Sequence, residues 1–201
     1  MSIKNRNQDT KNKRIAVDLE NTIINIMPPF IDLLRKEHNI IMDEKELLRE
    51  YNLNKTTGLD HDAIRELFKK VWEPPYSELM LLYSNSVPSV LEKISKNFSI
   101  DIITATEGNQ KIIKKWLSDH EIKYDNIIFV KSAKDKVNYI FEIIIEDYPE
   151  VAKLALENNK KVILVDWLYN RNEPGLDGKQ NFFRVKSWDE IPKIVYGKRY
   201  K

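Results

Sequence analysis

Short apolar runs that end in polar residues recur along the chain, and they set the expected architecture. The runs are rich in β-branched residues and have the length of strands that are buried on both faces. We predict strands over residues 14–19, 99–104, 126–130, 142–146 and 161–166. Apolar stripes at helical spacing lie between the later runs, at residues 110–117 and 151–156. This alternation predicts an α/β fold, a Rossmann-like, doubly wound parallel sheet with helices on both faces.

Residues 24–87 interrupt the alternation directly after the first strand. Apolar residues recur there at helical spacing, around residues 30–34, 46–48 and 64–72, and no strand pattern separates these segments. Turn-forming residues divide them, among them the Pro74-Pro75 pair. We therefore predict a helical insertion of residues 24–87 in a core that is formed by residues 14–23 and 88–201.

Charge and composition narrow the class of protein. The chain of 201 residues has 33 basic and 31 acidic residues, and this balance gives no electrostatic footprint for nucleic acid or for a membrane surface. Because the chain has no cysteine, disulfides and thiolate ligands or nucleophiles are excluded. No apolar stretch has the length of a membrane span. Residues 1–13 are polar and basic, and this composition predicts a mobile tail and no signal peptide. We expect a soluble, cytoplasmic protein, and a homodimer stays open.

Acidic residues gather where the predicted strands end. Asp18 and Glu20 end the first strand, whereas Glu146 and Asp147 end the fourth and Lys136 shortly precedes it. Since ligands of open α/β sheets bind at the carboxyl ends of the strands, these side chains should converge on one site. Carboxylates held together repel one another, and a hard divalent cation such as Mg²⁺ relieves the repulsion. A metal-bound carboxylate stays ionised and can attack phosphorus, so these residues predict Mg²⁺-assisted phosphoryl chemistry.

Four segments resemble, in order, the motifs of the haloacid dehalogenase (HAD) superfamily of phosphohydrolases. They are Asp18-Leu19-Glu20-Asn21-Thr22, Ile102-Ile103-Thr104, Asp135-Lys136 and Glu146-Asp147-Tyr148-Pro149. Two later segments, Trp167-Leu168-Tyr169-Asn170-Arg171 and Val185-Lys186-Ser187-Trp188, are similar to those of the cytosolic 5'(3')-deoxyribonucleotidases. The resemblance covers residues 14–195. It implies a HAD core with a cap after the first strand, and a Mg²⁺-dependent 5'-nucleotidase that hydrolyses nucleoside or deoxynucleoside monophosphates through an aspartyl-phosphate.

The resemblance also implies the catalytic and metal-binding residues. Asp18 would be the nucleophile and a metal ligand, and Glu20 would give its backbone carbonyl to Mg²⁺ and its side chain to proton transfer. Asp147 and Glu146 would complete the metal site. Glu20 and Glu146 stand where the family has aspartate, and the extra methylene of Glu20 moves the proton-transfer group. Slower turnover, or accumulation of the aspartyl-phosphate, follows as a hypothesis.

Further residues are expected around the substrate. By the resemblance, Thr104, Ala105 and Lys136 would bind the phosphate. The aromatic residues of the insertion, Phe30, Phe68, Trp72 and Tyr76, are candidates to stack on a base, with packing in the core as the alternative. The expected partner is a small phosphomonoester. Three other functions stay open: a sugar or metabolite phosphatase, a nucleic-acid-end phosphatase that uses the basic tail, and a domain that binds nucleotide without turnover.

Overall fold

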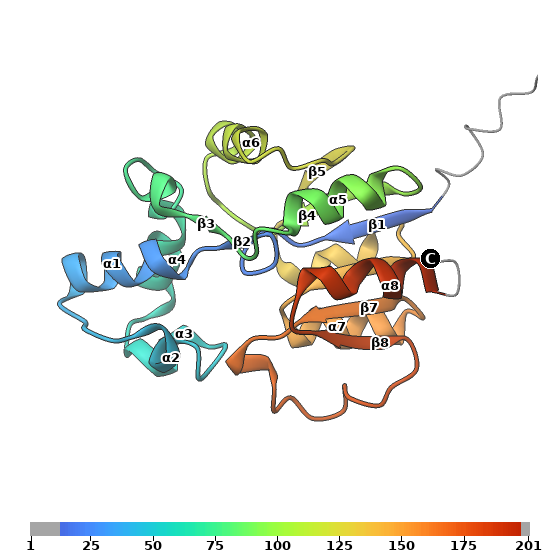
Figure 1. Cartoon of the computed structure of the whole chain (residues 1–201). Helices are drawn as coiled ribbons and strands as arrows, with labels where there is room; N and C mark the ends of the chain where they lie inside the picture. The colour runs from blue at the N-terminus through green and yellow to red at the C-terminus, as the bar shows by residue number, and fades with distance from the viewer. Residues whose placement is uncertain (1–12, 198–201) are drawn as a thin grey trace, which may run out of the picture.

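Six parallel strands form the central sheet of the computed structural model, which describes residues 13–197 (Figure 1). In chain order they are β1 (Arg14–Val17), β4 (Ser99–Thr104), β5 (Asn126–Phe129), β6 (Ile143–Glu146), β7 (Lys161–Val165) and β8 (Phe182–Val185). Their order across the sheet is β5-β4-β1-β6-β7-β8, and every neighbouring pair is parallel. The predicted parallel α/β sheet is therefore confirmed.

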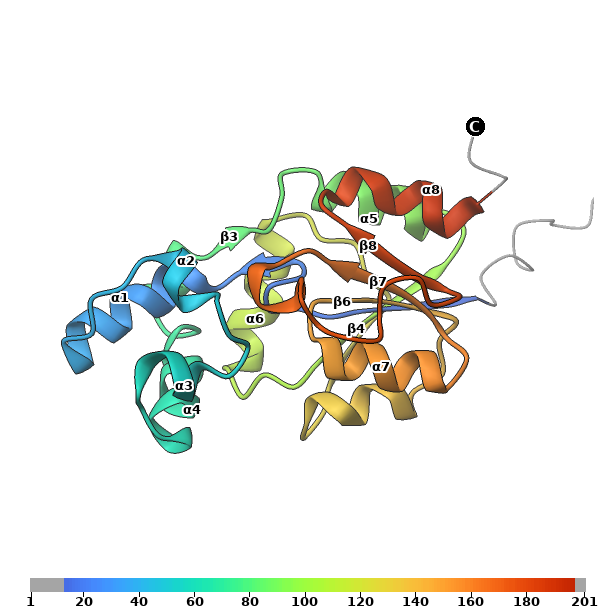
Figure 2. The ribbon, with the colours of Figure 1, turned by 90° about the horizontal axis from the view of Figure 1, so that it is seen from below.

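Alternate residues of the central strands enter two separate hydrophobic cores, because successive side chains of a strand point to opposite faces. On β1, Ile15 and Val17 belong to one core and Ala16 to the other. Helices α5 (Val87–Ser95) and α8 (Ile191–Tyr196) cover the first face, and α7 (Pro149–Glu157) covers the second (Figure 2). Helices on both faces make the sheet doubly wound, as the sequence predicts.

The chain builds the sheet in two directions from β1. It passes first to β4 and β5, with α6 (Gln110–Asp119) between them, and then crosses to β6, β7 and β8 on the other side of β1. The carboxyl ends of β1, β4 and β6 thus lie side by side where the direction of winding reverses. Ligands of open α/β sheets bind at such a point, so this edge is where a site is expected.

The segment between β1 and α5 is mainly helical and lies beyond the carboxyl end of β1 (Figure 1). Its helices are α1 (Met27–His38), α2 (Glu44–Leu47), α3 (Leu53–Thr57) and α4 (His61–Lys70), followed by the 3₁₀ turn η1 (Tyr76–Leu79). Side-chain caps fix where three of them begin, since Asp43, Asn52 and Asp60 each accept a hydrogen bond from a backbone N–H of the first turn. Phe30 of α1 and Phe68 of α4 pack together, with ring centroids 5.0 Å apart.

Three strands of the structure lack a signal in the sequence. Two of them, β2 (Ile24–Asn25) and β3 (Leu81–Leu82), pair antiparallel where the chain leaves the sheet and returns to it. Two residues are too few to show a period of two. The third is the edge strand β8, whose outward residue Phe183 is apolar and 38% exposed. An apolar residue on the solvent side hides the alternation that identifies a half-buried strand.

Short 3₁₀ turns follow the later strands. They are η2 (Ala133–Asn138) between β5 and β6, η3 (Leu168–Asn170) between β7 and β8, and η4 (Trp188–Glu190) between β8 and α8. Within residues 13–197, every helix is too short or too polar to cross a membrane. The predicted tail lies outside the described residues except for Lys13.

Candidate active site

Three carboxylates meet at the carboxyl ends of β1 and β6. Asp18 follows β1 directly, Glu146 is the last residue of β6, and Asp147 comes next. One carboxylate oxygen of each lies within 4.8 Å of those of the other two. All three residues are buried, Glu146 completely. The structure thus brings together three of the four residues that the sequence analysis selected as metal ligands.

Lys136 is the positive partner of these acids. It lies in η2 and is buried, and its Nζ atom is 2.6 Å from Asp18 Oδ1 and 3.1 Å from Glu146 Oε2. Burial lowers the pKa of Lys136, but Asp18 and Glu146 raise this pKa by more, so the ammonium stays charged. The backbone N–H of Ser132 donates to Asp135 Oδ2 at 3.0 Å, which fixes the start of the turn that carries Lys136.

A single ammonium does not balance three buried carboxylates. Burial raises the pKa of Glu146 and that of Asp147, and the negative charge of Asp18 raises both further. A divalent cation bound among these oxygens would relieve the same repulsion. Because the donor set consists of hard carboxylate oxygens at strand ends, the residues present fit a hard cation of the Mg²⁺ type.

Hydrogen bonds from neighbouring elements hold Asp147 in place. The hydroxyl of Tyr169, in η3, donates to Asp147 Oδ2, and that of Thr22 donates to Oδ1 at 3.4 Å. The side-chain amide of Asn170 donates to the backbone carbonyl of Asp147 at 2.9 Å. Outer partners of this kind orient carboxylates that bind metals, so these contacts belong to the site as much as the acids do.

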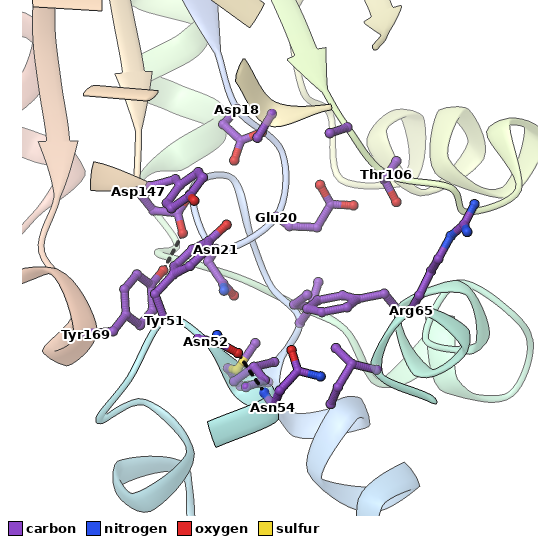
Figure 3. Close-up of a pocket in the computed structure, with 18 of the residues that line it drawn as sticks. Asp18, Glu20, Asn21, Tyr51, Asn52, Asn54, Arg65, Thr106, Asp147 and Tyr169 are labelled. Carbon is purple, nitrogen blue, oxygen red and sulfur yellow. Dashed lines mark hydrogen bonds between the residues drawn. The ribbon is translucent and has the colours of Figure 1, made fainter. Parts of the chain in front are cut away.

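Glu20 lies beside the three acids with hydrogen-bonding partners of its own. Its Oε2 atom accepts a hydrogen bond from the Thr104 hydroxyl at 2.8 Å, and its Oε1 atom accepts one from the indole N–H of Trp72 at 3.2 Å. The carboxylate is turned toward Thr106 (Figure 3). Burial raises the pKa of Glu20, and the charge of Asp18 raises it further.

A cavity of about 680 Å³ opens over the acids, between the edge of the sheet and the helices of residues 24–87. Its size is within the range of sites for small molecules. Asp18, Glu20, Lys136 and Asp147 lie on the side of the sheet. The opposite wall combines polar and apolar side chains. Tyr51, Asn52, Asn54 and Arg65 belong to it (Figure 3), and so do His61, Phe68 and the aliphatic residues Ile26, Met27, Leu48, Leu53 and Ile64. The cavity can therefore hold a phosphate at one end and a larger group with both polar and apolar surface at the other.

The remaining residues of the sequence prediction fall into three groups. Ala105 and Phe68 line the cavity. Thr104 is fully buried, and its hydroxyl is bonded to the carboxylate of Glu20. The other three aromatic residues belong to the hydrophobic core or pack against it: Phe30, Trp72 and Tyr76.

Three tyrosines and a threonine to which the sequence analysis gave no role are part of the site. Tyr51 precedes α3 and stacks on Tyr148, with ring centroids 3.9 Å apart, and its edge contact with Tyr169 has a centroid distance of 5.5 Å. Thr106 lines the cavity two residues after the end of β4. Because Thr106 lies so near a predicted strand end, the sequence could have identified it as a site residue. The sequence around Tyr51 gives no such indication, because the residues that Tyr51 contacts lie far away in the chain.

Comparison with known proteins gives this geometry a context. A family model described as "5' nucleotidase, deoxy (Pyrimidine), cytosolic type C protein" matches residues 12–200. "Putative nucleotidase OB0422" of Oceanobacillus iheyensis is 25% identical over an alignment length of 200, with coverage of 89% of this chain and 96% of that protein. The solved structure of the haloacid dehalogenase-like family hydrolase SP0104 from Streptococcus pneumoniae is 16% identical, with a TM-score of 0.61 and coverage of 91% of this chain and 98% of that one.

A second solved structure, titled a predicted phosphatase from Clostridium acetobutylicum, is 15% identical, with a TM-score of 0.65 and coverage of 92% of this chain and 98% of that one. At such low identity the solved structures bear on the fold alone. They confirm the HAD-like, Rossmann-type fold that the sequence motifs predict.

Proposed function

The chain belongs to the 5' nucleotidase, deoxy (pyrimidine), cytosolic type C family, and from this premise we propose that it is a Mg²⁺-dependent phosphatase of nucleoside monophosphates. One observation carries the proposal. Asp18, Glu146 and Asp147 converge around Lys136 at the floor of a cavity, with a second carboxylate, Glu20, beside them. Phosphoryl transfer needs little more than a positioned nucleophile, a positive charge for the phosphate oxygens and a group that moves protons.

In the first step, a carboxylate oxygen of Asp18 attacks phosphorus. A bond forms between that oxygen and phosphorus, and the ester bond from phosphorus to the leaving oxygen breaks. Glu20 in its protonated form gives its proton to the leaving oxygen, so that the nucleoside departs as an alcohol. Lys136 offsets negative charge on the phosphoryl oxygens. Its Nζ atom, 2.6 Å from Asp18 Oδ1, keeps the nucleophile oriented as well.

In the second step, water hydrolyses the aspartyl-phosphate. Glu20, now ionised, takes a proton from the water as the oxygen of that water attacks phosphorus. The bond between phosphorus and the Asp18 oxygen breaks, and inorganic phosphate leaves. The residues that would hold Mg²⁺ are Asp18, Asp147 and Glu146, with the backbone carbonyl of Glu20. When bound there, the cation would neutralise negative charge on the reacting phosphate.

We propose that residues 24–87 form a cap that selects the substrate. The wall of the cavity that comes from this segment offers an aromatic ring at Phe68 and side-chain amides at Asn52 and Asn54. A ring can stack on a nucleobase, and amides can donate to and accept from its polar edge. These contacts favour a nucleoside monophosphate over a smaller phosphomonoester, which would leave this wall unused.

A cytoplasmic location is part of the proposal. It is supported by the description of the family as a cytosolic type and by the absence of cysteine from the chain. The expected partner is a small molecule, and the balanced charge of the chain gives no support for nucleic acid.

The test is phosphate release from a panel of ribo- and deoxyribonucleoside monophosphates, in Mg²⁺ or EDTA, with Asp18→Asn beside the unmodified protein. Asp119→Asn is the matched control, because Asp119 is exposed on α6 and pairs with Lys115. We expect release that requires both Mg²⁺ and Asp18 and is unaffected in the control. Sugar phosphates and phosphorylated oligonucleotide ends belong in the panel. Faster release from either of them would overturn the nucleotide assignment.

A further inference from the structure

The indole ring of Trp72 is hydrogen-bonded to Glu20 but does not line the cavity. Trp72 comes two residues after the last residue of α4, and its side chain is fully buried. Its Nε1–H donates to Glu20 Oε1 at 3.2 Å. Trp72 is not among the residues that line the cavity, so any influence it has on the reaction must pass through Glu20.

Contact with the core fixes the direction in which the indole N–H points. The ring lies directly against Gly108, in the loop after β4, where an added Cβ atom would be 2.2 Å from Trp72 Cδ1. The backbone N–H of Gly108 is itself held by Thr106 Oγ1 at 3.2 Å. Trp72, which belongs to the insertion, thus packs against the loop that borders the cavity, and this packing holds its indole N–H in one orientation.

Glu20 is bonded at both carboxylate oxygens. Trp72 donates to Oε1 and the Thr104 hydroxyl donates to Oε2, at 3.2 and 2.8 Å. Glutamate has one more rotatable bond than aspartate, so that an unrestrained carboxylate at this position would populate several rotamers. These two donors, one from the sheet and one from the insertion, act together with a hydrogen bond from the side chain of Thr106 to hold Glu20 in a single rotamer.

We propose that Trp72 is a positioning residue for Glu20 and supports the use of glutamate where the family motif has aspartate. The indole N–H holds the longer side chain in the rotamer from which it exchanges protons with the leaving oxygen and with water. This inference rests on the proposed function. It assigns Trp72 a role in proton transfer in place of stacking on the base.

The experiment is a double-mutant cycle that joins Trp72→Phe to Glu20→Asp. Phenylalanine keeps a ring against Gly108 and removes only the donor. Aspartate is shorter by one carbon–carbon bond of about 1.5 Å, so it cannot reach Trp72 and Thr104 together. Trp116→Phe is the control for the loss of a buried indole, because Trp116 lies in α6 and stacks on His120.

We expect Trp72→Phe to lower kcat about 10- to 100-fold with KM nearly unchanged, since a proton-transfer group is displaced while the cavity is not. Rapid-quench experiments should show that the aspartyl-phosphate accumulates. In the Glu20→Asp background, the same change should leave kcat within about twofold. An unaltered kcat in Trp72→Phe, an equal loss in both backgrounds, or an effect on KM alone would overturn the proposal.

A second measurement does not depend on turnover. The indole ¹⁵N–¹H resonance of Trp72, assigned by its absence in Trp72→Phe, should move upfield in Glu20→Asp as the hydrogen bond is lost. A resonance that stays in place would refute the contact. If the unmodified protein releases no phosphate from any substrate, the proposed function fails, and this resonance alone decides whether Trp72 holds Glu20.

Discussion

Replacing Lys136 by methionine tests how the buried acids are kept together. Methionine is close to lysine in length and volume but carries no charge. The ammonium of Lys136 lies 2.6 Å from Asp18 Oδ1 and 3.1 Å from Glu146 Oε2. Because the pKa of Glu146 is raised, the Asp18 carboxylate is the main partner, and with an effective dielectric constant of about 20 this one attraction amounts to roughly 6 kcal/mol. Removing the ammonium also removes its own desolvation cost of several kcal/mol, so the net loss is about 3–5 kcal/mol.

The assay is urea unfolding in EDTA and again in Mg²⁺. In EDTA, the free energy of unfolding of Lys136→Met should fall by about 3–5 kcal/mol. Mg²⁺ should restore more stability to this variant than it adds to the unmodified protein, because a cation that binds only the folded state stabilises it in proportion to its affinity. Removing a positive charge beside the acids raises that affinity.

Lys134→Met is the matched control, since Lys134 lies in the same turn but forms an exposed pair with Glu150. Its free energy of unfolding should change by no more than about 0.5 kcal/mol. The reasoning is refuted if Lys136→Met unfolds at the same urea concentration as the unmodified protein in EDTA. That result would mean that the acids of the metal-free protein are neutral without the lysine.

Two further changes test other contacts of the site. Tyr169→Phe removes the hydroxyl that donates to Asp147, so the Mg²⁺ concentration needed for half-maximal phosphate release should rise about 10- to 100-fold, with exposed Tyr139→Phe as the control. An unchanged Mg²⁺ requirement would show that the hydroxyl does not orient the carboxylate. Gly108→Ala should lower the free energy of unfolding by about 1–3 kcal/mol and also reduce kcat, because its Cβ would collide with Trp72. Urea unfolding and steady-state kinetics measure both effects, and an unperturbed variant would contradict the close packing.

The part of the structure that the sequence predicts is the part determined by short-range patterns. A strand such as Ile143–Glu146 consists of consecutive apolar residues with acids at its end, so both the strand and the chemistry at its end can be read locally. The topology of the sheet then predicts which strand ends meet. Parallel strands that are wound in two directions bring Asp18 close to Glu146 and Asp147, although these residues lie far apart in the chain.

Contacts between elements distant in sequence could not be predicted in this way. Nothing near Trp72 in the sequence indicates that its indole faces Glu20, and nothing near Tyr51 indicates a stack on Tyr148. Thr104 illustrates the same limit. Its position at a strand end can be predicted from the sequence, but its contact with the carboxylate of Glu20 cannot, because Glu20 lies far away in the chain. Such pairings follow from packing in three dimensions, which a linear pattern does not encode.

The short antiparallel pair of β2 and β3 has a consequence for how this protein can diverge. Ile24 lies opposite Leu82 and Asn25 opposite Leu81, so the chain departs from the sheet and comes back at a single point. Whatever lies between these two residues can be lengthened, shortened or grafted from a relative without a shift in the register of the six parallel strands. If the proposed function holds, recognition and chemistry would be carried by separately exchangeable segments, and a change of specificity would leave the six-stranded sheet and its acidic residues unchanged.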